Sequence, residues 1–335
     1  MHNPKINSGK YRFVSLFLLC SLVFSTLSGC SRNTEPLHYQ GYYFNTVITL
    51  TFYNETDAQL QGNCFSLCQK YENMLSRTVE GSDIWNINHG NGQPVSVQEE
   101  TYALLEDAIS YCEQTDGQID ITVAPLMDLW DFTSGIEEKA PPTKKDIDTI
   151  LPHINYKNVI LKDGTVTLTD PEAGIDLGFI AKGFIADKLK EYLMEQGVTS
   201  ALINLGGNIL TIGSKPDGSA YTIGVKDPFS VNGGHLTTVS STDNSVVTSG
   251  TYERYFTWEN TRYHHILDAS TGYPAETDIA GVTIICDSST KADALSTTCL
   301  LLGKEKALEL LASFPDTEGI FITNDGEIYS TRENE

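Results

Sequence analysis

The sequence predicts an α+β protein with mixed and antiparallel sheets against which amphipathic helices pack. Two observations predict it: apolar residues recur at helical spacing in four segments, and strand-like runs occur between and after them. The chain has 335 residues, of which 40% are apolar, so it can bury one large core or two ordinary ones. The expected helices are about 57–75, 98–113, 179–197 and 288–302.

The expected strands alternate apolar and polar residues or are continuously apolar. The segment 159–169 reads as a hairpin around Asp163-Gly164, a dipeptide typical of tight turns. Residues 133–150, with Pro141-Pro142 and mixed charge, read as a surface excursion or linker. The expected strands are 46–52, 159–161, 165–169, 201–212, 221–225, 236–239, 245–249, 252–256 and 282–286.

The first residues form a targeting segment outside the fold. Three basic residues precede an apolar run, Phe13 to Leu27, which is short for a membrane span. The run ends in Leu27-Ser-Gly-Cys30, which resembles a bacterial lipobox. We therefore expect a signal peptide at 1–29, lipid on Cys30 and a tether at 30–40. The protein would be exported and anchored to the cell membrane on its extracytoplasmic side; an uncleaved signal anchor is the alternative.

Charge and cysteine usage exclude several classes of function. A formal net charge of −22 argues against nucleic acid and against electrostatic docking on anionic lipid. Five cysteines follow Cys30, and no paired CxxC units of the zinc-binding kind occur among them. Cys112 and Cys299 lie on apolar helix faces and are expected in the core. No cysteine is assigned a catalytic role.

One stretch couples an acid to a helix start. Asp176 follows an apolar lead-in, and Gly178 and Gly183 flank the residues where the third expected helix begins. A glycine-containing turn at a helix N-terminus presents free N–H groups that suit a phosphate. The Asp176 carboxylate would repel a phosphate bound there, so we expect it to contact a ribose or a base, or to help place a metal. An ordinary strand-to-helix turn is the other interpretation.

Two further segments carry isolated polar groups. Asp120 interrupts an apolar run, so it is either a hydrogen-bonded structural carboxylate or a ligand contact. In the last long helix, Asp293, Ser296 and Thr297 stand at i, i+3 and i+4 on one face. Such hard oxygen donors suit Mg²⁺ shared with a phosphate, although a polar face with a capping role would use the same residues.

Six motifs in order make the chain resemble the ApbE family of flavin transferases over nearly all of residues 40–330. They are Leu75-Ser-Arg-Thr with Ser82-Asp-Ile-Trp-Asn-Ile-Asn88, Asp116-Gly-Gln-Ile-Asp-Ile-Thr-Val-Ala-Pro-Leu126, Ile175-Asp-Leu-Gly-Phe-Ile-Ala-Lys-Gly183, Asn204-Leu-Gly-Gly-Asn208, His265-Ile-Leu-Asp-Ala-Ser-Thr-Gly-Tyr-Pro274 and Ala292-Asp-Ala-Leu-Ser-Thr297. The resemblance implies a T-fold-related architecture with an FAD cleft between two halves of a 41–330 domain, their boundary near 133–175.

The resemblance also implies roles for individual residues. Asp293, Thr297 and the backbone carbonyl of Phe179 match the Mg²⁺ ligands, and Ser296 stands where many relatives carry a second acid. His265 matches a histidine of the flavin site and is our first choice for the general base, with Asp293 as the second catalytic residue. The positions that match FAD contacts are Thr78, Gln118, Ile119, Asp120, Asp176, Lys182 and Ile266.

The implied reaction is Mg²⁺-dependent transfer of FMN from FAD to a Thr or Ser hydroxyl of a partner protein, releasing AMP. The implied acceptor motif is Asp-Gly-x-x-Ser/Thr-Gly-Ala-Ser/Thr, on flavin subunits of membrane electron-transfer systems. Two alternatives remain open at this point: an FAD pyrophosphatase that gives FMN and AMP, and a flavin-binding lipoprotein without catalytic activity.

Overall fold

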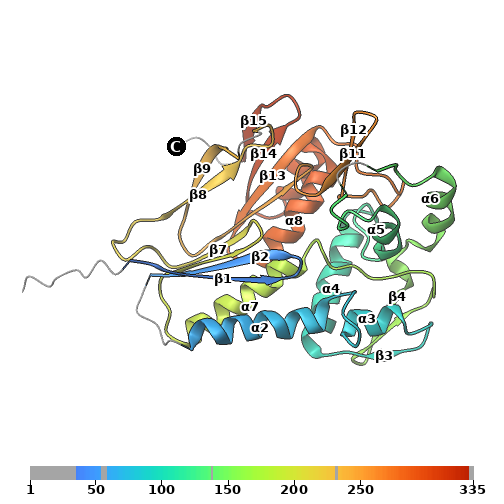
Figure 1. Cartoon of the computed structure of the whole chain (residues 1–335), viewed down its shortest axis with the longest axis horizontal. Helices are drawn as coiled ribbons and strands as arrows, with labels where there is room; N and C mark the ends of the chain where they lie inside the picture. Colours follow the sequence, from blue (N-terminus) through green and yellow to red (C-terminus); the bar gives the residue numbers. More distant parts are fainter. Residues whose placement is uncertain (1–34, 54–58, 137–138, 231–232, 332–335) are drawn as a thin grey trace, which may run out of the picture. The chain divides into compact units, whose positions relative to one another are not determined.

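The computed structural model describes residues 35–53, 59–136, 139–230 and 233–331. Residues Pro36–Glu335 form one compact unit (Figure 1). The expected signal peptide and the lipidation site Cys30 lie outside the described residues. No helix of the described part is long and apolar enough to cross a membrane.

An eight-stranded sheet organises this unit, and every neighbouring pair in it is antiparallel. The expected strand at 201–212 is in fact two strands, because the chain reverses at Gly206 and Gly207, both of which have positive φ. In sheet order the strands are β1 (Leu37–Tyr43), β2 (Thr46–Phe52), β6 (Ala201–Leu205), β7 (Asn208–Ile212), β10 (Ser245–Gly250), β13 (Ile279–Cys286), β14 (Glu318–Thr323) and β15 (Ile328–Ser330).

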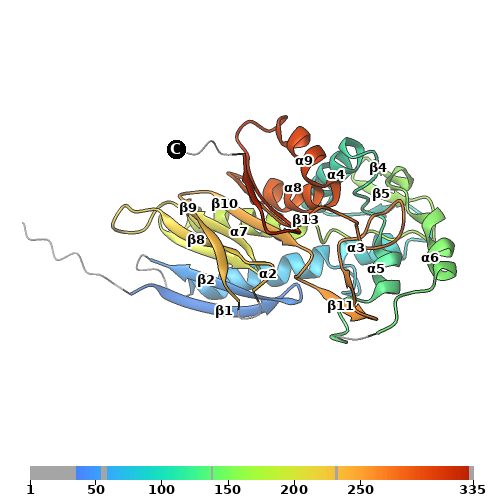
Figure 2. The same ribbon diagram turned by 90° about the horizontal axis from the view of Figure 1, so that it is seen from above.

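Helices cover one face of the sheet (Figure 2). Helix α8 packs on β7, β10 and β13, and α7 packs on β6, β7 and α8. Alternate residues of the central strands face opposite ways, so Val247 joins the core under the helices while Val246 packs against a hairpin on the other face. The helices are α2 (Leu60–Leu75), α7 (Ala181–Glu195), α8 (Ser289–Leu302) and α9 (Lys304–Leu311), and the hairpin is β8 (Tyr221–Lys226) with β9 (His235–Ser241).

The segment between β2 and α7 adds short helices and a small sheet. In that sheet β5 lies between β3 and β4, and the β4–β5 turn falls at Asp163 and Gly164 as predicted. Farther along the chain, β11 (Tyr255–Trp258) and β12 (Thr261–His264) form a separate hairpin. The elements of the first segment are α3 (Asp83–Asn88), β3 (Val95–Ser96), α4 (Glu99–Gln114), α5 (Ala124–Trp130), α6 (Lys144–Ile150), η1 (Leu151–His153), η2 (Tyr156–Asn158), β4 (Val159–Lys162) and β5 (Thr165–Leu168).

The structure confirms the four long helices, and the described residues add four short α-helices that the sequence analysis missed, α3, α5, α6 and α9. Ser82 caps α3 by accepting a hydrogen bond from the Trp85 N–H. Pro125 lies in the first turn of α5, where a missing N–H leaves no bond unmade, so it begins a helix instead of ending one. Part of the expected linker is α6, which Thr143 caps.

The cysteines of the described part are buried and unpaired. Burial raises the pKa of the Cys64, Cys68, Cys112 and Cys299 thiols to about 12, which keeps them protonated and unreactive at neutral pH. The expectation that Cys112 and Cys299 belong to the core is confirmed.

Candidate active site

A glycine brings the two sequence-distant halves of the site together. Gly183, in the first turn of α7, lies against the start of α8. A Cβ at this position would lie 2.1 Å from the carbonyl oxygen of Ser289 and 2.8 Å from the Cβ of Asp293. Only glycine therefore permits this approach. The Asp293 carboxylate is consequently placed at the N-terminus of α7.

Asp293 is the buried acid of the site, with an exposed fraction of 2%. Its Oδ2 accepts a hydrogen bond of 2.9 Å from the Gly183 N–H, and its Oδ1 lies 3.4 Å from Nζ of Lys182. Burial raises the pKa of the Asp293 carboxyl, while Lys182 and the Gly183 N–H oppose that rise. Asp293 therefore caps α7 through Oδ2, a capping role that the sequence analysis left open. Its Oδ1 faces the ammonium of Lys182.

Three hydroxyl groups lie beside this acid. Ser249 of β10 points at α8, where its Oγ is 2.8 Å from Oγ of Ser296 and 3.1 Å from Oγ1 of Thr297. The Ser296 hydroxyl donates its proton to the Asp293 carbonyl, 3.0 Å away, so its oxygen accepts from Ser249. Ser296 is buried and Thr297 half-buried. Ser249 was not predicted, because no spacing in the sequence links it to α8.

The donor set fits a small hard cation. One carboxylate, hydroxyls and a backbone carbonyl are oxygen ligands, and Mg²⁺ prefers such ligands together with water. Within the described ranges, no group of three or more His, Cys, Asp and Glu side chains could hold a metal. Phe179 lies in the turn that leads into α7, its half-buried ring edge-on to Tyr111 at 6.3 Å between centroids.

Asn208, the first residue of β7, contacts the start of α8. Its Oδ1 accepts a hydrogen bond of 2.7 Å from Oγ of Ser289, which fixes the orientation of the amide. Its Nδ2 is buried without a hydrogen-bond partner, and the amide lies close enough to help lower the pKa of Asp293. A buried donor without a partner beside a carboxylate is suited to an anionic oxygen. The motif that ends at Asn208 was noted in the sequence, but without a role for this side chain.

The acid before α7 has its partner in Arg77. Nε of Arg77 lies 2.7 Å from Oδ2 of Asp176, and its other branch lies 2.6 Å from Oδ1 of Asp128. The second oxygen of Asp176 accepts from the Gly178 N–H at 2.7 Å. The sequence analysis missed Arg77, although it quoted the motif that contains it. Its charge removes the conflict between an acid and a nearby phosphate.

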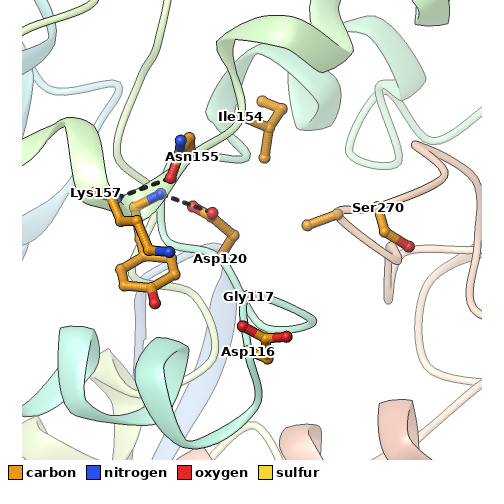
Figure 3. Close-up of a pocket in the computed structure, with 9 residues that line it drawn as sticks. Asp116, Gly117, Asp120, Ile154, Asn155, Lys157 and Ser270 are labelled. Carbon is orange, nitrogen blue, oxygen red and sulfur yellow. Dashed lines mark hydrogen bonds between the residues drawn. The ribbon is translucent and has the colours of Figure 1, made fainter.

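Asp120 is held by the chain itself and borders a cavity of about 190 Å³. Its Oδ1 accepts from the N–H and the hydroxyl of Thr122, and its Oδ2 accepts from the Tyr156 N–H at 2.7 Å. Figure 3 shows the carboxylate turned toward the segment of Asn155, with Ser270 across the cavity. Asp120 thus has the structural role that the sequence analysis left open, and its contact with FAD stays a prediction.

His265 follows β12 and is oriented by backbone. Its Nδ1 lies 3.2 Å from the carbonyl oxygen of Arg254. Since a carbonyl only accepts, Nδ1 carries the proton and Nε2 keeps its lone pair. The ring is half-buried, and the loss of solvent around it, followed by the charges of Arg254, His264 and Lys182, lowers the pKa of His265 to about 3. The neighbouring His264 is buried, with Nε2 donating to the Ala275 carbonyl at 3.2 Å.

The remaining predicted residues make no polar contact with Asp293 in the described part. Thr78 is exposed, with its hydroxyl 3.1 Å from that of Ser76, and Gln118 is half-buried in the turn after α4. Ile119 and Ile266 are buried. In the described part, no hydrogen bond or ion pair joins any of these four side chains to Asp293. The structure therefore joins Asp293 directly to Lys182 and Ser296, and Ser249 links Ser296 to Thr297.

Comparison with known proteins decides the family. A family profile described as the ApbE family matches residues 44–321. The chain belongs to the ApbE family. A curated ApbE-type relative from Klebsiella pneumoniae, named FAD:protein FMN transferase, is 36% identical over 293 residues, which cover 87% of this chain and 90% of the relative. A relative of the same name from Treponema pallidum is 37% identical over 280 residues, covering 79% and 77%.

Solved ApbE structures share the fold. The ApbE protein of Thermotoga maritima superposes with a TM-score of 0.80 at 32% identity, covering 88% of this chain and 96% of that one. The flavin transferase ApbE of Vibrio cholerae gives a TM-score of 0.79 at 26% identity, covering 88% and 97%. The predicted α+β class with helices packed on antiparallel sheets is confirmed, as is the resemblance to the ApbE family.

Proposed function

We propose that this chain is an enzyme that transfers FMN from FAD to a hydroxyl group of another protein. The observation that carries the proposal is the Asp293 carboxylate, buried against Lys182 and Gly183 beside three hydroxyl groups. Such a site can place positive charge against the two phosphates of a substrate. The names of the relatives from Klebsiella pneumoniae and Treponema pallidum support the same reaction.

We further propose that the reaction depends on Mg²⁺. Asp293, Thr297 and the Phe179 carbonyl would hold it, with the Ser296 hydroxyl as a weaker neighbour. When bound, the ion would supply positive charge at the pyrophosphate. The chemistry of the donor set supports this assignment, because all of these groups offer oxygen.

His265 is suited to accept the proton of the acceptor hydroxyl. Its Nδ1 proton is engaged by the Arg254 carbonyl, so Nε2 is free; its lowered pKa keeps the ring neutral at pH 7 and also makes it a weaker base than free imidazole. The acceptor oxygen would attack the phosphorus of the FMN half. The bond from that phosphorus to the bridging oxygen breaks, AMP leaves with the bridging oxygen, and the hydroxyl proton passes to His265.

Other residues would position FAD. The Lys182 ammonium lies 3.4 Å from Asp293, and its charge helps to lower the pKa of His265. Arg77, shared with Asp128, offsets part of the charge of Asp176, whose oxygens can accept from ribose or base donors. Thr78, Ile266 and the segment 118–120 would complete the contacts. The acceptor would be a Thr or Ser of the Asp-Gly-x-x-Ser/Thr-Gly-Ala-Ser/Thr kind.

For location, we propose an exported lipoprotein. Support comes from the leader, whose basic start, apolar run and Leu27-Ser-Gly-Cys30 ending are typical of lipid attachment at Cys30. The body would then face the extracytoplasmic side, where flavin subunits of membrane electron-transfer systems would be its acceptors. Globomycin, which blocks lipoprotein signal cleavage, should leave the leader attached; a mature N-terminus other than Cys30 would contradict the proposal.

The transfer reaction has a direct test. The chain, FAD, Mg²⁺ and a motif-bearing acceptor domain are incubated, and the acceptor is weighed by mass spectrometry. We expect a mass gain of one FMN, lost when Mg²⁺ is chelated. The Asp293→Asn variant keeps an acceptor for the Gly183 N–H and should fold, but it should lose metal binding by calorimetry as well as transfer. The absence of an adduct on any motif-bearing acceptor would contradict the proposal.

The same assay separates the two alternatives. Release of FMN and AMP without an acceptor, at a rate equal to that with one, would indicate a pyrophosphatase. Recovery of intact FAD after incubation with Mg²⁺ and acceptor would indicate a binding protein. The metal-suited donors beside Asp293 favour a catalyst over a binding protein, since flavin binding alone needs no metal.

A further inference from the structure

Arg254 is a cation without an anionic partner in a strongly acidic chain. Three arginines fall within the described residues. Arg77 contacts two carboxylates, and Arg262 stacks on Tyr255 at 4.4 Å from the ring centroid. Arg254 is exposed, and its guanidinium makes no ion pair or hydrogen bond with any described residue. The Arg254 guanidinium is therefore open to a partner that the chain itself does not supply.

The position of Arg254 relates it to the site. It lies in the bend between β10 and β11, a few residues after Ser249, whose hydroxyl contacts Thr297. Its carbonyl oxygen accepts from both the backbone N–H of His265 at 3.0 Å and the ring Nδ1. One residue therefore orients the proposed base through its backbone carbonyl and carries an exposed guanidinium on the same residue.

The charge around His265 is unbalanced. Both Arg254 and Lys182 act on this imidazole. The charge of Lys182 is offset by Asp293 at 3.4 Å, whereas that of Arg254 is offset by nothing in the described part. A guanidinium presents its N–H groups as a fork that matches two oxygens of a phosphate or carboxylate. The guanidinium of Arg254 is thus available to an anionic group of a substrate.

We propose that Arg254 is a substrate-binding residue whose guanidinium contacts the phosphate oxygens of FAD on the His265 side of the site. The inference rests on the proposed function and adds a residue to it. A phosphate is favoured over an acceptor carboxylate because Arg254 adjoins the base, and the base must act next to the phosphorus under attack. Arg254 would balance the charge of the pyrophosphate from one side while the Asp293 region does so from the other.

The test uses the full chain and its variants Arg254→Ala and Arg254→Lys. The matched control is Arg262→Ala, which removes the same charge from the neighbouring hairpin. Binding of FAD, FMN and riboflavin is followed by flavin fluorescence without acceptor, so the readout does not require turnover. We expect Arg254→Ala to weaken FAD and FMN binding by about tenfold or more, as for a lost charged hydrogen bond. Riboflavin, which has no phosphate, should bind unchanged.

Further outcomes are equally decisive. Arg254→Lys should fall between wild type and Arg254→Ala, since it keeps the charge and loses the fork. Equal weakening of riboflavin would mean a general disturbance of the site and would overturn the proposal. Unchanged FAD affinity with a raised KM for the acceptor would assign Arg254 to an acceptor carboxylate, which also overturns it. If wild type binds FAD but transfers nothing, the proposed function fails while the binding comparison still decides the role of Arg254.

Discussion

Asp187 and Asp293 cap each other's helices. Asp187 of α7 accepts hydrogen bonds from the N–H groups of Ser289 and Thr290 at the start of α8, at 2.8 and 2.9 Å. Asp293 of α8 accepts from the Gly183 N–H at the start of α7, at 2.9 Å. Each carboxylate therefore meets the positive end of the partner helix. This exchange fixes the crossing of α7 and α8 and with it the acid of the proposed metal site.

The crossing tolerates no side chain at Gly183. We expect Gly183→Ala to destabilise the fold by about 2 kcal/mol or more, because its Cβ would overlap the Ser289 carbonyl oxygen, 2.1 Å away, and drive the helices apart. The free energy of unfolding in urea is the measurement. The variant should also lose affinity for Mg²⁺, since Asp293 would be displaced.

Gly62 supplies the matched control. It lies in α2, is exposed, and a Cβ there would meet no atom within 4 Å. Gly62→Ala should leave the protein as stable or stabilise it by about 0.5–1 kcal/mol through helix propensity. Equal effects of the two substitutions would contradict the packing argument.

Removal of the Asp187 cap should weaken the start of α8. Asp187→Ala leaves the N–H groups of Ser289 and Thr290 without their acceptor, and we expect a loss of about 1–2 kcal/mol in the free energy of unfolding. Glu191→Gln, which breaks an exposed pair with Lys188 in the same helix, should change it by less than about 0.5 kcal/mol. If Asp187→Ala were as stable as this control, the capping of α8 by Asp187 would contribute nothing to stability.

The sequence predicted what depends on local pattern and missed what depends on distant contacts. Helices α7 and α8 followed from apolar spacing, and the grouping of Asp293 with Thr297 followed from their positions on one face. Ser249 and Arg77 could not be found this way, because each meets its partners only through the fold. A polar group in an unexplained place, such as Asp176, was the one local sign that a distant partner existed.

The buried thiols offer a test of the core. Cys64, Cys68, Cys112, Cys286 and Cys299 are buried and unpaired, and burial raises the pKa of each thiol to between about 11 and about 12. At pH 8 a thiol reagent should leave these five unmodified in the native protein and label all five in urea, as mapped by mass spectrometry. Rapid native labelling of Cys112 or Cys299 would contradict their place in the core.

The pH dependence tests the role of His265. The protein environment lowers the pKa of His265 from 6.5 to about 3 and that of the buried His264 to about 4, so the unfolded chain binds protons on both rings at mildly acidic pH that the native chain does not. Stability should therefore be complete above about pH 6.5 and fall as pH drops from there toward about 3.

A neutral base also predicts that kcat/KM for FAD stays level from about pH 7 down to about pH 5, because kcat/KM reports the free enzyme. His265→Gln should lower kcat by about 10² to 10⁴ and lessen the loss of stability between these pH values. An acid limb of kcat/KM centred near pH 6.5 and abolished in this variant would mean that His265 titrates normally, and the neutral imidazole held by Arg254 could not be its working state.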